Sequence, residues 1–254
     1  MKYMFDEELI LFGLKRSGNA AIISFILHLG DKREFTHDHN THLRVTKKFA
    51  KWQRKNLYYY RKHLNTVENM NLQEMLKESD EYNRMKKELA LKLGCDSFSG
   101  TQRNLILLRS PHNNLASLFA SRLRGRIDKI NDFQYLWKQY ADEVLSITNY
   151  LGDSKIVILF DEWFQSENYR KYLSSLLGVE YTDRTDVGIN RVIRLGSSFD
   201  GKKYQGKAQQ MKVLDRWKKY KDNSEYREIL LGDEDIVERT KEIFDIDLSL
   251  LLEL

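Results

Sequence analysis

The chain has few of the residues that cross-link small secreted proteins or build linkers. Its 254 residues include a single cysteine, Cys95, so neither an internal disulfide nor a zinc site built from several cysteines can form. A single proline, Pro111, excludes a proline-rich linker. No apolar run reaches membrane-spanning length without charge, and three acids at 6–8 precede any long apolar run, unlike a secretory signal. These absences predict a cytoplasmic protein without a transmembrane segment.

The balance of charge is only mildly positive. Lys and Arg number 42 against 37 Asp and Glu, which gives a net charge of +5. This excess favours anionic ligands without requiring nucleic acid. One stretch, 44–63, has no acid and several aromatic residues. Such a stretch suits an acidic glycan, a lipid head group or nucleic acid, or it is a solvated helix with one aromatic side in the core.

Strand-like and helix-like segments alternate along the chain. Short apolar runs predict strands at Leu9–Gly13, Leu105–Leu108 and Lys155–Phe160, with a further candidate at Glu34–His37. Helices are expected between and after them, at 17–29, 111–123, 133–151, 165–177 and from 207 onward. The alternation predicts an α/β fold with a central, mostly parallel sheet flanked by helices. We expect one domain over 1–254, interrupted at about 45–93 by a helical insertion or cap.

The first predicted strand runs straight into a turn that carries two glycines and two cations. Gly13 and Gly18 let the backbone bend and approach a ligand closely. A helix that begins after such a turn presents its first N–H groups, and its dipole favours negative charge. Lys15 and Arg16 add positive charge at the same place. The pattern predicts an anion site, against the alternative of an ordinary connection with solvated cations.

The turn differs from the phosphate loop of ATP and GTP enzymes. That loop reads G-x-x-x-x-G-K-[ST], and Gly13 and Gly18 have its spacing. Asn19 and Ala20 follow, however, where the loop needs a lysine for the phosphates and a hydroxyl for magnesium. Asp161 at the end of "IVILFD" would suit a magnesium-positioning acid, but it carries little weight without that hydroxyl. A nucleotide hydrolase or kinase is therefore disfavoured.

The stretch "LKRSGNAA" instead resembles the 5′-phosphate loop of sulfotransferases that use 3′-phosphoadenosine 5′-phosphosulfate (PAPS). On this resemblance Arg16 takes the place of the catalytic cation. The implied cofactor-binding set in the loop is Lys15, Arg16, Ser17, Gly18, Asn19 and Ala20.

Three later stretches resemble the same family. "LLRSPHNNLASLF" is similar to its 3′-phosphate signature R-x-P-x-[D/N]-x-x-x-S, which implies that Arg109 and Ser117 bind the 3′-phosphate. "KIVILFDEW" resembles a strand that ends in a structural acidic pair, here Asp161 and Glu162. "RLGSSFDGKKYQG" resembles the loop that closes over the nucleotide, and it implies four more cofactor-binding residues: Arg194, Gly196, Ser197 and Ser198.

Two positions depart from the family pattern. Many members carry lysine at the position of Arg16, and arginine stays protonated, so it can stabilise charge but not pass on a proton. Many members also stack an aromatic residue on adenine where this chain has Ala21. Phe199 and Trp217 are the candidates for that stacking.

A catalytic base is expected in "EFTHDHNTH". The family often places its base in this region, and a histidine has the right ordinary pKa for base work at neutral pH. We rank His37 and Asp38 first. A metal site built from the same histidines and a plain solvated loop are the alternatives.

The sequence thus predicts a PAPS-dependent sulfotransferase that transfers a sulfuryl group to a hydroxyl acceptor and releases 3′,5′-ADP. No metal is required by this scheme. The acceptor is a hydroxylated molecule such as a carbohydrate or glycolipid. The alternatives are a P-loop nucleotide hydrolase or kinase and a basic nucleic-acid-binding module, which the mild net charge disfavours.

Overall fold

A computed structural model describes residues 7–14, 16–27, 29, 101–122, 133–181, 199–200, 204 and 210–253. The candidate strand at 34–37 and the helical insertion expected at about 45–93 lie outside these ranges.

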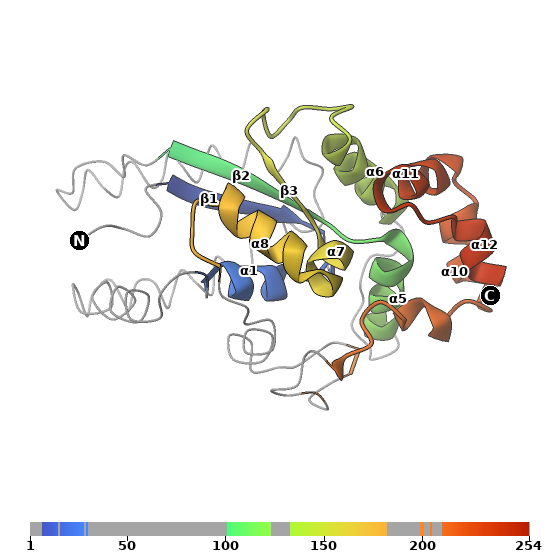
Figure 1. Cartoon of the computed structure of the whole chain (residues 1–254). Helices are drawn as coiled ribbons and strands as arrows, with labels where there is room; N and C mark the ends of the chain where they lie inside the picture. The colour runs from blue at the N-terminus through green and yellow to red at the C-terminus, as the bar shows by residue number, and fades with distance from the viewer. Residues whose placement is uncertain are drawn as a thin grey trace, which may run out of the picture.

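The described strands form one parallel sheet in the order β1 (Glu7–Gly13), β2 (Thr101–Leu108), β3 (Ile156–Leu159). Both strand pairs are parallel, and Figure 1 shows all three arrows pointing toward the α5 end of the molecule. Parallel strands need crossover connections, and each strand here is followed in the chain by a helix. The α/β class with a central parallel sheet is therefore confirmed.

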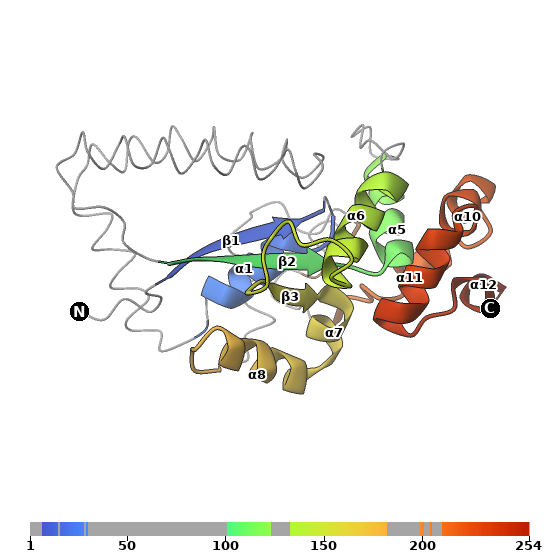
Figure 2. The ribbon, with the colours of Figure 1, turned by 90° about the horizontal axis from the view of Figure 1, so that it is seen from above.

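Helices cover both faces of the sheet. Successive residues of β2 point to opposite faces, so its apolar side chains are divided between two cores. Leu105 and Leu107 pack with α1 (Asn19–Leu27), α7 (Phe160–Gln165) and α8 (Glu167–Leu176). Ile106 and Leu108 face the other core. That core is built from α5 (Pro111–Arg122), α6 (Phe133–Val144), η2 (Arg216–Lys219), α10 (Ser224–Leu231), α11 (Glu234–Phe244) and α12 (Leu248–Glu253). Figure 2 shows α8 and α6 on opposite sides of the strands.

Helix α6 is shorter than the sequence pattern suggests. It ends at Val144 instead of 151, because the buried carboxylate of Glu143 organises the loop that follows. This carboxylate accepts hydrogen bonds from the Thr148 hydroxyl at 2.8 Å and from the backbone N–H groups of Tyr150 and Leu151 at 2.9 and 3.0 Å. A satisfied buried acid stabilises a loop that propensity alone would continue as helix.

The connection after β3 also differs from the prediction. Phe160 was expected in the strand and is instead the first residue of α7. The helix expected at 165–177 is α8, and a short helix that was not expected, α7, precedes it; Ser166 ends α7, and its side chain caps α8 by accepting from the N–H of Tyr169 at 3.1 Å. Phe160 is thereby placed at the end of the sheet, not within it.

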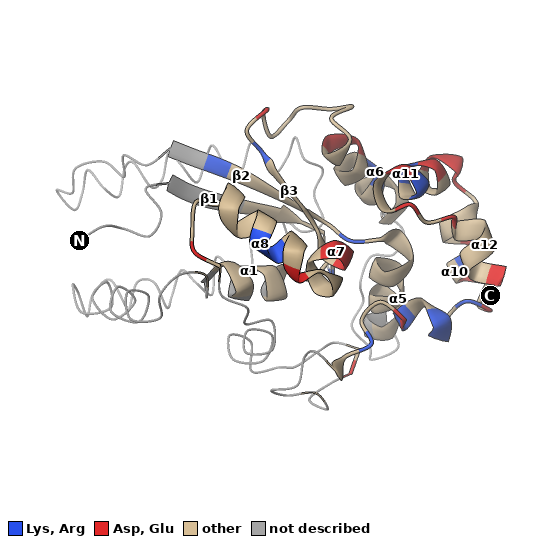
Figure 3. Cartoon of the chain, viewed as in Figure 1, with Lys and Arg blue, Asp and Glu red and all other residues tan. Residues whose placement is uncertain are grey.

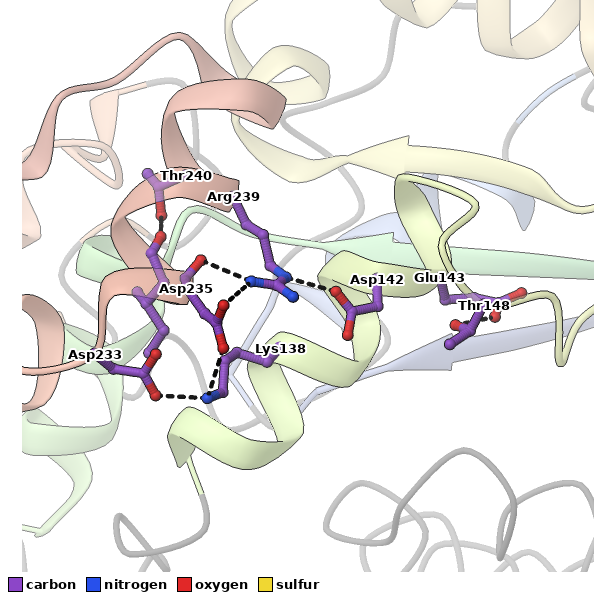
Figure 4. Close-up of polar contacts among 9 residues, drawn as sticks. Lys138, Asp142, Glu143, Thr148, Asp233, Asp235, Arg239 and Thr240 are labelled. Atoms are coloured by element: carbon purple, nitrogen blue, oxygen red, sulfur yellow. Dashed lines mark hydrogen bonds and ion pairs between the residues drawn. The ribbon is translucent and has the colours of Figure 1, made fainter.

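An ion-pair network joins α6 to α11 (Figure 4). Lys138 pairs with Asp233 at 2.7 Å and with Asp235 at 3.3 Å, while Arg239 pairs with Asp235 at 2.8 Å and with Asp142 at 2.5 Å. Each partly exposed pair contributes little alone, but a network fixes the register between two helices. The C-terminal helices are thus joined to α6, which itself packs on β2. No described helix has the length and apolar character needed to cross a membrane.

Candidate anion-binding site

Three chain segments meet at the carboxyl edge of the sheet. β1 ends at Gly13, which pairs with Leu107, and β2 ends at Leu108, which pairs with Leu159 at the end of β3. Because the strands are parallel, the turns that leave them lie along one edge. Open α/β sheets bind their ligands outside this edge. The glycine turn after β1 and the arginine after β2, singled out separately in the sequence, are therefore brought together.

The turn between β1 and α1 is held by two side chains that fold back onto it. Asn19 Nδ2 donates to the carbonyl oxygen of Leu14 at 3.0 Å, and the buried Ser17 hydroxyl donates to the same oxygen at 2.5 Å. A Cβ at Gly13 would lie 2.0 Å from Asn19 Oδ1, so any larger residue would displace the Asn19 side chain from this position. These side chains shape the turn. The N–H groups of Ala21 and Ile22 donate to the carbonyl of Gly18 at 2.8 and 3.2 Å, which starts α1 at this turn and places the positive end of its dipole here.

Two residues of this turn have left-handed backbone conformations. Gly18 has a φ of 104° and Arg16 a φ of 67°. The left-handed region costs a non-glycine residue about 1–2 kcal/mol, so the surroundings must hold Arg16 in place. One such contact is visible: the carbonyl oxygen of Arg16 accepts a hydrogen bond from Arg109 Nη1 at 3.2 Å. Strain of this kind is concentrated where a chain contacts a ligand.

Arg109 stands at the end of β2 and is buried, with 2% of its surface exposed. Besides the Arg16 carbonyl, Nη1 donates to the Ser117 hydroxyl at 3.1 Å, and Nη2 donates to the carbonyl of Val213 at 2.6 Å. The Nε–H has no hydrogen-bond partner among the described residues. Within those residues Arg109 also forms no ion pair with a carboxylate. A buried cation with an unused donor is an arrangement that suits an anionic ligand.

A second buried arginine, Arg216 of η2, reaches the same hydroxyl. Its Nη1 donates to Ser117 Oγ at 3.2 Å, and its Nη2 forms an ion pair with Asp200 at 2.9 Å. The Ser117 hydroxyl in turn donates to the carbonyl of Asn113 at 3.0 Å. Two guanidinium groups therefore converge on one hydroxyl of α5. Figure 3 shows basic residues both between β2 and α5 and on the segment that precedes α10.

Arg216 was missed in the sequence because nothing marked it. It belongs to the basic run "RWKKYK", and no motif covers it. Only the packing of η2 on α5 brings it to Ser117, 99 positions earlier in the chain.

The electrostatics of the two arginines agree with an anion site. Burial, and after it the nearby charge of Arg216, lower the pKa of Arg109 to about 9, with Asp161 opposing the shift. Burial also lowers the pKa of Arg216, with Asp200 opposing. A lowered pKa means that the surroundings disfavour the charged form of each arginine. An anion bound between them would favour the charged form of both.

Asp161 has a structural position, as the sequence resemblance implied. Its carboxylate is buried and accepts hydrogen bonds from the backbone N–H of Ser110 at 2.8 Å and from the Ser110 hydroxyl at 2.6 Å. Ser110 directly precedes α5 and accepts from the N–H of Asn114 there. Asp161 thus occupies the N-terminus of α5, where negative charge is favoured. Any anion held by Ser117 would lie farther along that helix.

Of the two aromatic residues considered for adenine stacking, only Phe199 lies beside the arginines with part of its surface accessible. Its ring is half-buried, and the guanidinium carbon of Arg216 lies 4.9 Å from the ring centroid. Trp217 is 5% exposed and packs edge-on against His112 in the core. Ala21 is buried within the other core, against the sheet. Phe199 is therefore the better placed candidate.

The remaining candidate residues lie outside the described ranges: Lys15, His37, Asp38, Arg194, Gly196, Ser197 and Ser198. Ala20 is described as part of α1, without its side chain. Within the described ranges no three His, Cys, Asp or Glu side chains gather as metal ligands. The histidine cluster of 37–42 lies outside those ranges.

Comparison with known proteins gives one structural likeness. No family model and no curated protein matches the chain. Among solved structures, the sulfotransferase domain from the Synechococcus PCC 7002 olefin synthase aligns over 95% of each chain, with 14% identity and a TM-score of 0.48. A likeness at this identity and TM-score does not define a family. The functional argument therefore depends on the site itself.

Proposed function

We propose that this chain is a sulfotransferase that takes its sulfuryl group from PAPS and transfers it to a hydroxyl acceptor, such as a carbohydrate. The observation that carries the proposal is the convergence of Arg109 and Arg216 on the Ser117 hydroxyl, beside the glycine turn after β1. A nucleotide with phosphates on both the 3′ and 5′ positions needs two anion sites on one edge of the sheet. The turn and the arginine pair supply two.

The arginine pair suits the 3′-phosphate. Arg109 has five N–H donors, of which Nε–H and one hydrogen of Nη2 are unused among the described residues. Arg216 donates to the same hydroxyl, so a phosphate beside Ser117 lies within reach of both cations. Hydrogen bonds from arginine to phosphate are roughly twice as strong as neutral ones. They would also offset the mutual repulsion of the two guanidinium groups.

The glycine turn suits the 5′-phosphosulfate. In the proposed reaction an acceptor oxygen forms a bond to sulfur, while the bond from sulfur to the 5′-phosphate oxygen breaks and leaves its electron pair on that oxygen. The N–H groups at the start of α1 and the guanidinium of Arg16 would stabilise this developing charge. His37 or Asp38 would take the acceptor's proton. Lys15, Arg194, Gly196, Ser197 and Ser198 complete the proposed nucleotide contacts.

A thermal-shift series tests the class of enzyme. We expect 3′,5′-ADP to raise the melting temperature in the presence of EDTA. Arginine side chains and backbone N–H groups would bind its phosphates, a task that magnesium shares in ATP enzymes. Binding to the folded state raises the free energy of unfolding by about 2.7 kcal/mol when the ligand is at a hundredfold excess over Kd. Mg-ATP should stabilise the protein much less, because it has no 3′-phosphate for Arg109 and Ser117. A large shift with Mg-ATP and none with 3′,5′-ADP would refute the proposal in favour of a nucleotide hydrolase or kinase.

A further inference from the structure

The ring of Phe160 contacts both parts of the anion-binding site. Phe160 follows β3 directly and is buried, with 4% of its surface exposed. On the side of the glycine turn, a Cβ at Gly18 would lie 2.2 Å from Cε2 of this ring, so the ring rests directly on the backbone of the turn. The guanidinium carbon of Arg109 lies 4.8 Å from the centroid of the same ring. The ring thus touches the turn and the arginine at once.

A hydrogen bond closes the arrangement. Arg109 Nη1 donates to the carbonyl of Arg16, two residues before Gly18, at 3.2 Å. The ring of Phe160 is itself fixed by its own helix, because the buried Trp163 packs on it with a centroid distance of 5.5 Å. Close packing of this kind transmits a displacement of one group to its neighbours.

We propose that Phe160 is a positioning residue that sets the separation between the 5′-phosphate site and the 3′-phosphate site. The inference rests on the proposed function. Both phosphates belong to one ribose, so the ligand dictates how far apart the two sites must be. A nucleotide with one phosphate needs only one of the sites and is insensitive to their separation. Phe160 therefore acts on ligands that carry both phosphates.

The chemistry of the ring is specific to this task. Its flat face can lie against a glycine backbone and also attract a guanidinium group, whose desolvation strengthens that attraction. Leucine at position 160 would fill much of the core volume but would present neither a flat surface to Gly18 nor a π face to Arg109. Phe164 offers a matched control, because it belongs to the same helix and stacks on Phe160, with an interplanar angle of 20°.

Calorimetry with three nucleotides tests the proposal. Dissociation constants of 3′,5′-ADP, 5′-AMP and 3′-AMP are measured for wild type, Phe160→Leu and Phe164→Leu. We expect Phe160→Leu to weaken binding of 3′,5′-ADP at least about tenfold and that of each monophosphate less than about threefold. Phe164→Leu should change all three constants less than about threefold.

Each outcome separates the positioning role from the function on which it rests. Wild type that binds 3′,5′-ADP no more tightly than the monophosphates would overturn the proposed function itself. If wild type prefers 3′,5′-ADP and Phe160→Leu keeps the same preference, only the positioning role is overturned. Equal weakening for all three nucleotides would also overturn it, because Phe160 would then only support the fold. Should circular dichroism show Phe160→Leu unfolded, Phe160→Met is measured in the same way.

Discussion

Replacement of Arg216 by methionine is the sharpest test of the arginine pair, because this residue was assigned from the structure alone. Methionine keeps an unbranched apolar stem and removes the charge, the donor to Ser117 at 3.2 Å and the ion pair with Asp200 at 2.9 Å. If Arg216 holds the 3′-phosphate, Arg216→Met should weaken binding of 3′,5′-ADP. Binding of 5′-AMP, which lacks that phosphate, should change little.

The size of the effect follows from the bond that is lost. A hydrogen bond from a charged group contributes about 1.5–3 kcal/mol, which corresponds to roughly a 10- to 150-fold change in Kd. Arg216 is also the largest charge that lowers the pKa of Arg109. A pKa of about 9 keeps Arg109 charged at neutral pH with or without Arg216, so Arg109 does not make up for the lost bond. We expect binding to weaken by about 10- to 150-fold.

The assay is calorimetry with 3′,5′-ADP and 5′-AMP on the same protein preparations. The ratio of the two constants cancels any small change in stability, because both nucleotides bind the same folded state. Lys218→Ala is the control: Lys218 lies on the same 3₁₀ helix, pairs with Asp215 and has a side chain that is 59% exposed. Equal losses for both nucleotides, or no loss for 3′,5′-ADP, would refute the assignment of Arg216 to the 3′-phosphate.

Two further predictions concern Arg16 and His112. Arg16→Ala should abolish sulfuryl transfer with the fold intact by circular dichroism, and Arg16→Lys should keep part of it because a charge remains; near-normal turnover of Arg16→Ala would contradict its role. Burial lowers the pKa of His112 from its ordinary 6.5 to about 4, with Asp161 opposing and Arg109 adding to the shift. Its contribution to stability is therefore complete above pH 6.5 and is lost as the pH falls toward 4, because only the unfolded chain binds the proton there. Between pH 7.5 and 5 the free energy of unfolding, measured by chemical denaturation, should fall by about 2 kcal/mol more in wild type than in His112→Gln. An equal fall in both proteins would show that His112 does not cause the pH dependence.

Much of the sheet could be predicted from local pattern. The short apolar runs at Leu9–Gly13 and Leu105–Leu108 lie within β1 and β2, and the helix expected at 111–123 is α5 within one residue. Buried parallel strands are near-continuous apolar runs, so their existence is visible in sequence. The carboxyl-edge placement of the glycine turn and Arg109 then follows from parallel topology.

What could not be predicted depends on partners distant in sequence. The end of α6 is set by loop groups that reach back to Glu143, and the change from β3 to α7 at Phe160 places that ring on Gly18, far earlier in the chain. Arg216 reaches its site only through the packing of η2 on α5. Such contacts between distant residues cannot be predicted from residue type and spacing.

Two buried guanidinium groups that face one hydroxyl are an arrangement that stability alone does not favour. Burial lowers the pKa of both Arg109 and Arg216, and Asp200 is the only carboxylate among the described residues that forms an ion pair with either of them. Apolar side chains of similar size at buried charged positions are often neutral or stabilising. Under the proposed function, the 3′-phosphate accounts for this charge. An anion that binds only the folded state and relieves this repulsion makes the stability of the protein depend on the concentration of that anion.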